Sequence, residues 1–114
     1  MYQKGDVVLL PFPFTDLTAT KTRPAVVSVS AFEQATGDFT VAMITSVPHT
    51  TPYDYALRDW QTAHPLRPSW VRAKLATLDP ALVRYAPGRL SDTDFAEVEQ
   101  RLRRALGLSD STAT

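Results

Sequence analysis

Two histidines are the first residues to consider for chemistry, because imidazole is the side chain that ordinarily changes its charge near neutral pH. His49 and His64 could together supply the acid and base of a metal-free ribonuclease. Both lie in polar sequence close to prolines, where a solvated surface histidine is the simpler interpretation, and their spacing is not that of metal ligands. A two-histidine mechanism is therefore disfavoured, and His49 is the better candidate of the two.

The acidic residues argue against a metal-dependent nuclease, which needs several carboxylates gathered around a cation. Asp6, Asp16, Asp54 and Asp59 are scattered without ligand spacing, and the chain has no cysteine to serve as a thiolate ligand or nucleophile. We therefore expect no metal and no other cofactor. The lack of cysteine also excludes a disulfide framework and suits a reducing compartment.

Basic residues gather in one part of a chain whose formal net charge is zero. Zero net charge argues against a protein that coats nucleic acid through bulk charge, whereas a local basic face can still contact phosphates. Residues 67–90 contain only one acidic residue, Asp79, beside several basic ones. The candidates for phosphate contact in this region are Arg72, Lys74 and Arg84.

Aromatic side chains beside a basic face can stack on unpaired bases. Core packing explains most aromatic residues equally well. Phe12, Phe14 and Trp60 lie in loop-like sequence bordered by proline, which favours exposure of at least one of them. Tyr53 and Tyr55 are the other stacking candidates.

Length and composition indicate one globular domain. The chain has 114 residues, of which 44% are hydrophobic and 21% charged. We expect one domain over residues 1–108 and a disordered tail over 109–114. The first residues lack the apolar core of a signal peptide, and no apolar stretch reaches the about 20 residues that span a bilayer. We therefore expect a cytoplasmic protein with no membrane attachment.

Short apolar and β-branched runs predict a mainly β protein. The run over 7–10 predicts a strand buried on both faces, after which Pro11 and Pro13 stop regular pairing and predict an exposed loop up to Thr22. Five or six short strands predict a barrel-like core. The other expected strands are 25–29, 39–45, 70–78 and one that begins at Leu82, with turns at 36–38 and 79–80.

One helix is predicted over residues 91–106, because apolar residues recur there at three- and four-residue spacing. Ser91 can accept a hydrogen bond from the amide of Asp94, which satisfies a free donor at the helix start. Gly107 can adopt the left-handed conformation that ends a helix. The sequence therefore predicts a barrel followed by a C-terminal helix.

Several segments resemble the motifs of the MazF/PemK toxins, in the order in which that family has them. KGDVVLLPFPFTD at 4–16 and TRPAVV at 22–27 resemble the N-terminal signature, and AMITS at 42–46 resembles the second motif. The resemblance extends from Lys4 to about Leu108. The later matching segments are DW at 59–60, PSWVR at 68–72, KL at 74–75, TLD at 77–79 and GRLS at 88–91.

This resemblance implies an SH3-like barrel with a C-terminal α-helix, usually a homodimer, that cuts single-stranded RNA without a metal and is restrained by a small acidic antitoxin. The family's catalytic arginine and threonine match Arg23 and Thr45. The segment 17–22 lacks the glycines that many relatives have before the arginine, which leaves the preferred RNA sequence open. The candidate residues for RNA binding are Phe14, Thr15, Lys21, Pro24, Ser46, His49, Trp60, Arg72 and Lys74.

Cleavage by the RNA's own 2′-hydroxyl would give these two residues distinct roles. The guanidinium of Arg23 suits the developing charge on the phosphate, and the hydroxyl of Thr45 can orient it. The general base stays open, because arginine remains protonated at ordinary pH. Two other functions also stay open, a non-catalytic binding module and a toxin that resembles CcdB and binds DNA gyrase. Catalysis is favoured because a pure binder would need neither Arg23 nor Thr45.

Overall fold

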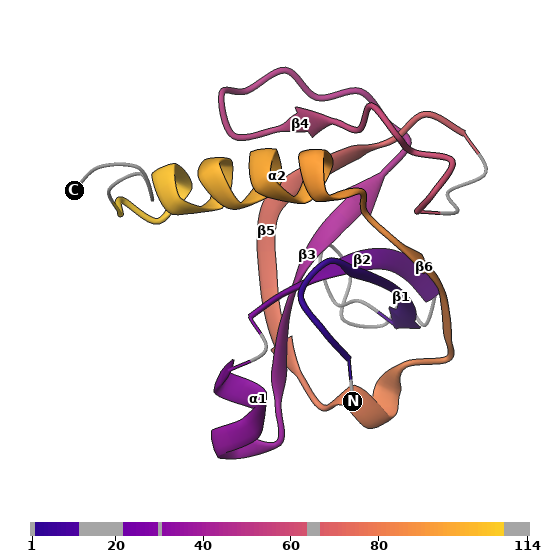
Figure 1. The fold of residues 1–114 in the computed structure, drawn as a ribbon, viewed down its shortest axis with the longest axis vertical. Helices are drawn as coiled ribbons and strands as arrows, with labels where there is room; N and C mark the ends of the chain where they lie inside the picture. The colour runs from indigo at the N-terminus through magenta and orange to yellow at the C-terminus, as the bar shows by residue number, and fades with distance from the viewer. Residues whose placement is uncertain (1, 12–21, 30, 64–66, 109–114) are drawn as a thin grey trace.

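The computed structural model describes residues 2–11, 22–29, 31–63 and 67–108. Figure 1 shows a curled sheet crossed by one long helix, with the short helix α1 at the far end of the sheet from the tip of β3. The strands are β1 (Asp6–Pro11), β2 (Thr22–Val29), β3 (Phe39–Thr45), β4 (Tyr55–Ala56), β5 (Trp70–Leu78) and β6 (Tyr85–Arg89). The helices are α1 (Ala31–Thr36), the 3-10 helix η1 (Pro80–Leu82) and α2 (Asp92–Ala105).

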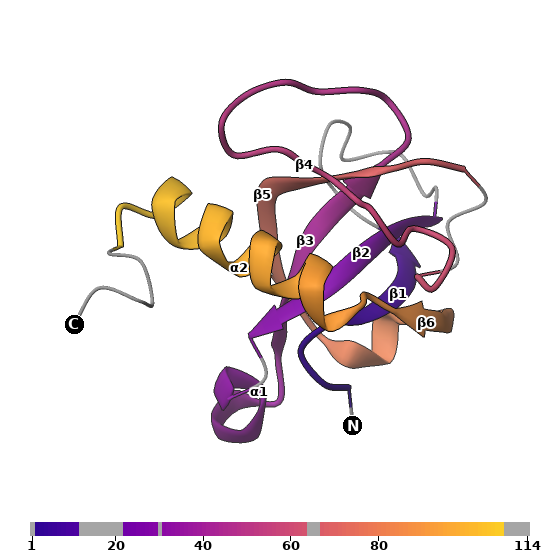
Figure 2. The ribbon, with the colours of Figure 1, turned by 45° about the horizontal axis from the view of Figure 1, so that its top comes forward.

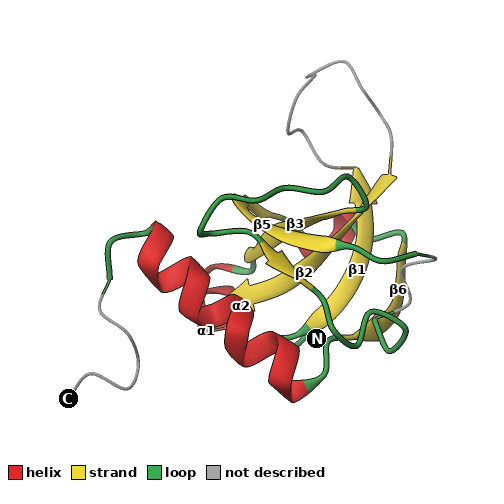
Figure 3. Ribbon diagram, turned by 90° about the horizontal axis from the view of Figure 1, so that it is seen from above, coloured by secondary structure: helices red, strands yellow, loops and turns green. Residues whose placement is uncertain are grey.

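The six strands form one sheet in the order β4-β5-β3-β2-β1-β6. Every neighbouring pair in it is antiparallel. Seen from above, the strands curl into a half-barrel with α2 along one side (Figure 3). This architecture confirms the predicted fold class, a mainly β barrel-like core with a C-terminal helix.

Apolar side chains line both faces of this sheet, as the uninterrupted apolar runs predict. One cluster contains Val26 and Ala42 and is covered by Val98 of α2. The other contains Ala25 and Val41, the direct chain neighbours of the first pair. Because successive side chains of a strand point to opposite faces, the second cluster lies on the face away from α2.

A buried carboxylate ties the start of α2 to the segment that follows β4. Asp94 is 0% exposed and accepts hydrogen bonds from the hydroxyl of Tyr55 at 2.6 Å and from the amides of Arg58 at 3.2 Å and Asp59 at 2.9 Å. Burial, together with the bond to this carboxylate, raises the pKa of Tyr55. Ser91 accepts from the amide of Asp94 at 3.1 Å, which confirms the predicted helix cap.

Several predicted elements are confirmed. The strands at 39–45 and 70–78 have the predicted bounds, and α2 fills the predicted helical segment. Gly107 has φ of 76° just after α2, as expected for a left-handed helix end. Within the described residues, no helix combines the length and the apolar character needed to cross a bilayer.

Other predicted boundaries are wrong. β1 includes Pro11, and β2 begins at Thr22 instead of residue 25. Pro24 has no amide hydrogen, but β2 tolerates it because at this position the strand pairs with β1 and not yet with β3. The strand expected at Leu82 is instead η1, and β6 starts at Tyr85. The sequence predicted neither α1 nor β4. The rest of the predicted loop, 12–21, and the tail 109–114 lie outside the described residues.

Candidate functional site

The ends of three adjacent strands carry the two residues predicted to be catalytic. We call this the Thr45 end of the sheet, where β3 ends and where β2 and β5 begin. The β2–β3 ladder begins with Ala25 opposite Met43, and Arg23 and Thr45 each lie two residues beyond that pair at this end of the sheet. Because successive side chains of a strand point to opposite faces, the side chains of Arg23 and Thr45 lie on the same face as Ala25, away from α2.

Arg23 belongs to β2 and pairs with Leu10 of β1. Its side chain is half-buried, and in the described part of the chain it has neither an ion-pair nor a hydrogen-bond partner. No acceptor among the described residues therefore competes with an anion for the donors of this guanidinium.

Thr45 is the last residue of β3, and its neighbour in β5 is Trp70. Its Oγ1 accepts a hydrogen bond from the amide of Val47 at 3.1 Å, so a local turn fixes the oxygen. Because the oxygen is the acceptor here, the hydroxyl proton stays free to be donated to a ligand. Local geometry therefore holds Thr45 as an oriented hydrogen-bond donor.

An ion pair fixes a second arginine beside this end of the sheet. Arg72 Nε donates to Asp54 Oδ1 at 2.9 Å, with side-chain exposures of 22% for the arginine and 2% for the aspartate. Asp54 Oδ2 also accepts from Thr51, from the amide at 3.1 Å and from the hydroxyl at 2.6 Å. Burial alone would raise the pKa of Asp54, but the bonds from Thr51 and Arg72 outweigh it and lower the pKa. Asp54 therefore stays ionised and restricts Arg72.

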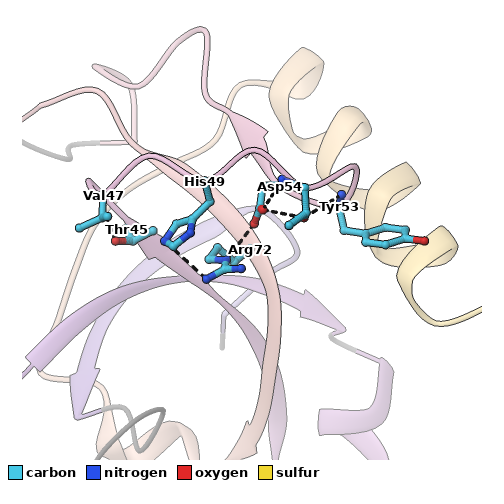
Figure 4. A network of polar contacts seen from close by, with 7 residues as sticks. Thr45, Val47, His49, Tyr53, Asp54 and Arg72 are labelled. Carbon is cyan, nitrogen blue, oxygen red and sulfur yellow. Dashed lines mark hydrogen bonds and ion pairs between the residues drawn. The ribbon is translucent and has the colours of Figure 1, made fainter.

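The segment between β3 and β4 brings a histidine to the same arginine. We call residues 46–54 the arch, because they leave the end of β3 in a long curve before the chain returns in β4 (Figure 2). His49, half-buried in the arch, has its Nε2 3.4 Å from Arg72 Nη1. Figure 4 shows the ring of His49 between Thr45 and Arg72, with Asp54 on the other side of the arginine.

An irregularity in β5 accompanies the placement of Arg72. Ile44 pairs with Val71, whereas Ala42 pairs with Leu75, so three residues of β5 face the single residue Met43 of β3. Such bulges bend a strand and re-aim its side chains, and they are frequent near functional sites. Arg72 and Lys74 both belong to this bulge.

The other candidates do not all join this cluster. Lys74 is half-buried and has no ion-pair partner among the described residues, Ser46 is exposed at the start of the arch, and Pro24 is half-buried within β2. Trp60 packs against the apolar cluster that α2 covers. Phe12, Phe14, Thr15, Lys21 and His64 lie outside the described residues.

The remaining candidates for stacking on bases or contacting phosphates differ in how far their side chains are exposed to solvent. Tyr53 is 42% exposed and Arg84 is exposed, so both remain accessible to a ligand. Tyr55 is wrong as a stacking candidate, because it is 8% exposed, bonds to Asp94 and has the guanidinium carbon of Arg101 4.6 Å from its ring centre.

Sequence reasoning missed Asp54 and Thr51 as the residues that hold Arg72. Asp54 lies 18 positions from Arg72, and nothing in its local sequence distinguishes it from a surface carboxylate. The described residues contain no cluster of three histidine, aspartate or glutamate side chains that could hold a metal ion.

Fold and site together define a small curled-sheet protein with arginines and an oriented hydroxyl at one end of the sheet. Over residues 3–106 the sequence matches the family described as PemK-like, MazF-like toxin of type II toxin-antitoxin system. The match spans most of the chain, so the chain belongs to this family of toxins, and the resemblance noted from the sequence motifs is confirmed. No curated protein sequence matches the chain significantly.

Solved structures with the same fold agree with this assignment. A chain of the MazE–MazF crystal structure from Deinococcus radiodurans (Form-II) has a TM-score of 0.71 and 27% identity, over 95% of this chain and 97% of that chain. An endoribonuclease from Mycobacterial species, in complex with its cognate antitoxin, has a TM-score of 0.75 and 18% identity, over 96% and 98%. The Mycobacterium tuberculosis toxin MazF-mt6 has a TM-score of 0.73 and 15% identity, over 91% and 98%. At their low identities, the last two support the fold alone.

Proposed function

We propose that this toxin is an endoribonuclease that cuts single-stranded RNA, and mRNA in particular, at selected sequences without a metal. The observation that carries the proposal is the end of the β2–β3 ladder, where Arg23 and Thr45 each lie two residues beyond the pair of Ala25 and Met43. Arg72 adds a second cation at the same end of the sheet. The MazF structure from Deinococcus radiodurans, at 27% identity, supports a toxin of the same kind.

In the proposed reaction the 2′-hydroxyl of the RNA attacks the adjacent phosphate, which leaves a 2′,3′-cyclic phosphate and a 5′-hydroxyl. Arg23 binds the phosphate oxygens and stabilises the charge that grows in the transition state. Thr45, whose oxygen already accepts from Val47, donates its hydroxyl proton to a phosphate oxygen and orients it. Arg72 and Lys74 contact neighbouring phosphates.

Three further proposals concern assembly and location. We propose that the toxin acts as a homodimer and that a small acidic antitoxin lies over the Thr45 end, where its carboxylates would compete with RNA for Arg23. MazE bound to MazF in Deinococcus radiodurans supports a partner of this kind. We also propose a cytoplasmic location, which the absence of cysteine supports.

The test is RNA cleavage by the purified protein in excess EDTA, with chemical identification of the new ends. The wild-type protein should cut a long single-stranded RNA at discrete sites and leave 2′,3′-cyclic phosphates. Arg23→Ala should reduce the rate by at least about 100-fold. Arg58→Ala removes an exposed arginine that follows β4 and should leave the rate unchanged.

Two results would contradict the proposal. Cleavage that stops in EDTA and returns with a divalent cation would indicate a metal-dependent nuclease. A wild-type protein that cuts none of a varied set of RNAs, but binds RNA or another macromolecule, would indicate a non-catalytic module.

A further inference from the structure

Building on the ribonuclease activity proposed above, we propose that His49 is the general base that takes the proton from the attacking 2′-hydroxyl. The proposal fills the one role that neither arginine nor threonine can perform well. It depends on where the arch places the imidazole and on the ion pair that holds Arg72 beside it (Figure 4).

The contact between His49 and Arg72 directs Nε2 of the ring toward the guanidinium. A guanidinium nitrogen can only donate, so His49 Nε2 must be the acceptor of the 3.4 Å contact from Arg72 Nη1. An Nε2 that accepts this bond presents its lone pair on the side of Arg72. A general base requires such a lone pair, and this one points toward a phosphate-binding group.

The same contact is long enough to yield to a substrate. At 3.4 Å it is weak, whereas the Arg72–Asp54 bond at 2.9 Å is charge-assisted and buried. A phosphate is a far better acceptor for the guanidinium than a neutral imidazole. When RNA binds, Arg72 can therefore pivot about its anchored Nε, present Nη1 to the phosphate and release Nε2 of His49.

The proposed step conserves atoms and charge. The 2′-hydroxyl proton moves to His49 Nε2, the 2′ oxygen forms a bond to phosphorus, and the bond from phosphorus to the 5′ oxygen breaks. The 5′ oxygen takes a proton from solvent water, and the imidazolium returns its proton to solvent. Arg23 and Arg72 hold the phosphate oxygens during the transfer.

Other groups at this end of the sheet are poorer bases. Asp54 is 2% exposed and its oxygens are occupied by Thr51 and Arg72, so it cannot reach a bound ribose. Arg23 and Arg72 have no free lone pair at ordinary pH. Arg72 is the charged residue in contact with His49 among the described residues, and Asp54 holds Arg72 in turn.

The experiment compares wild type, His49→Gln and His64→Gln in single-turnover cleavage between pH 5 and 9 in EDTA. His64→Gln is the matched control, since it changes the only other histidine of the chain in the same way. The wild-type rate should rise with pH at the acidic end and reach a plateau, because a general base must be unprotonated to accept a proton. His49→Gln should lower the plateau by about 100-fold or more and abolish the acidic limb, and His64→Gln should keep both.

Binding separates a base from a residue that only contacts RNA. The RNA used is an oligonucleotide that spans a mapped cleavage site and carries a 2′-deoxyribose at the attacking position. His49→Gln should bind it within about threefold of wild type. For His49→Ala, added imidazole should restore part of the cleavage rate.

Each contrary result has a distinct meaning. If His49→Gln weakens binding as much as it slows cleavage, or cleaves with the wild-type rate and pH profile, His49 is not the base although the ribonuclease assignment stands. If the wild-type protein cuts no RNA, the proposed function fails, and this inference fails with it.

Discussion

Asp54→Asn is the substitution for which the structure gives the most definite expectation. The change keeps the shape of a side chain that is 2% exposed but removes the charge that Arg72 faces at 2.9 Å. Asparagine can still accept from Thr51, whereas the ion pair with Arg72 is lost. A hydrogen bond to a charged group contributes about 1.5–3 kcal/mol, and Arg72, at 22% exposure, regains part of its hydration. We expect a loss of about 2 kcal/mol in the free energy of unfolding, or roughly 8 °C in Tm.

The pH dependence of this difference follows from the pKa of Asp54. Burial alone would raise the pKa, but the bonds from Thr51 and Arg72 outweigh it and hold the pKa below its ordinary value of 3.8. The ionised carboxylate therefore stabilises the fold fully above the unfolded-state pKa, and this stability is lost as the pH falls through the folded-state pKa. Asparagine does not titrate, so the deficit of the variant should shrink in acid.

Urea unfolding at a fixed protein concentration measures both expectations, at pH 7 and in steps down to pH 3. Asp92→Asn is the matched control, because it removes the same charge from an exposed position in the first turn of α2 and should cost no more than about 0.5 kcal/mol. Equal stability of wild type and Asp54→Asn at pH 7 would refute the argument. A deficit of the same size at pH 7 and pH 3 would show that the ion pair is not its cause.

Three further substitutions test the packing around α2 and β6. Tyr55→Phe removes the 2.6 Å bond to Asp94 and should cost about 1–2 kcal/mol in urea unfolding. Because the pKa of Tyr55 is raised above its ordinary value of 10.0, wild type should lose stability as the pH rises above that value, and the variant should lack this loss. Gly88→Ala would place a Cβ 2.7 Å from the carbonyl oxygen of Thr62 and should lower the free energy of unfolding by about 1–3 kcal/mol, whereas unchanged stability would show that the backbone yields there. Ser91→Ala removes the cap of α2 and should cost about 1 kcal/mol, measurable as a lower Tm.

Elements that are determined by their own sequence were predicted well. β3 and β5 are runs of apolar and β-branched residues that pair along most of their length, and α2 has both an apolar face and a capping serine. β4 has only two residues and exists because Tyr55 and Ala56 pair with β5. β6 contains proline and glycine, which disfavour strands, and forms as an edge strand on β1. Tertiary pairing, which no local pattern reports, decides both of these elements.

The residues of the candidate site likewise include some that the sequence identified and some that only the tertiary structure shows. The resemblance to the family motifs identified Arg23 and Thr45, and both lie just beyond the first pair of the β2–β3 ladder, Ala25 and Met43. Asp54 gave no such signal, because its partner Arg72 lies 18 positions away and the two meet only where the arch returns to β5. The sequence offered Asp54 as one of several scattered carboxylates and Arg72 as one of several basic residues. Their pairing became visible only in three dimensions.

The residues of the candidate site come from the strands and from the arch, and the two groups are held in place differently. Arg23 and Thr45 belong to strands whose neighbouring residues, such as Ala25 and Ile44, are buried, so their backbone positions are fixed by the core. His49 belongs to the arch, and within the described residues its side-chain partner is Arg72, which Asp54 holds in turn. The strands therefore fix Arg23 and Thr45, whereas the Asp54–Arg72 pair fixes the guanidinium that lies beside the proposed base. Asp54→Asn should accordingly reduce the cleavage rate more than it weakens RNA binding, because it loosens Arg72 next to His49 while it leaves Arg23 and Thr45 in place.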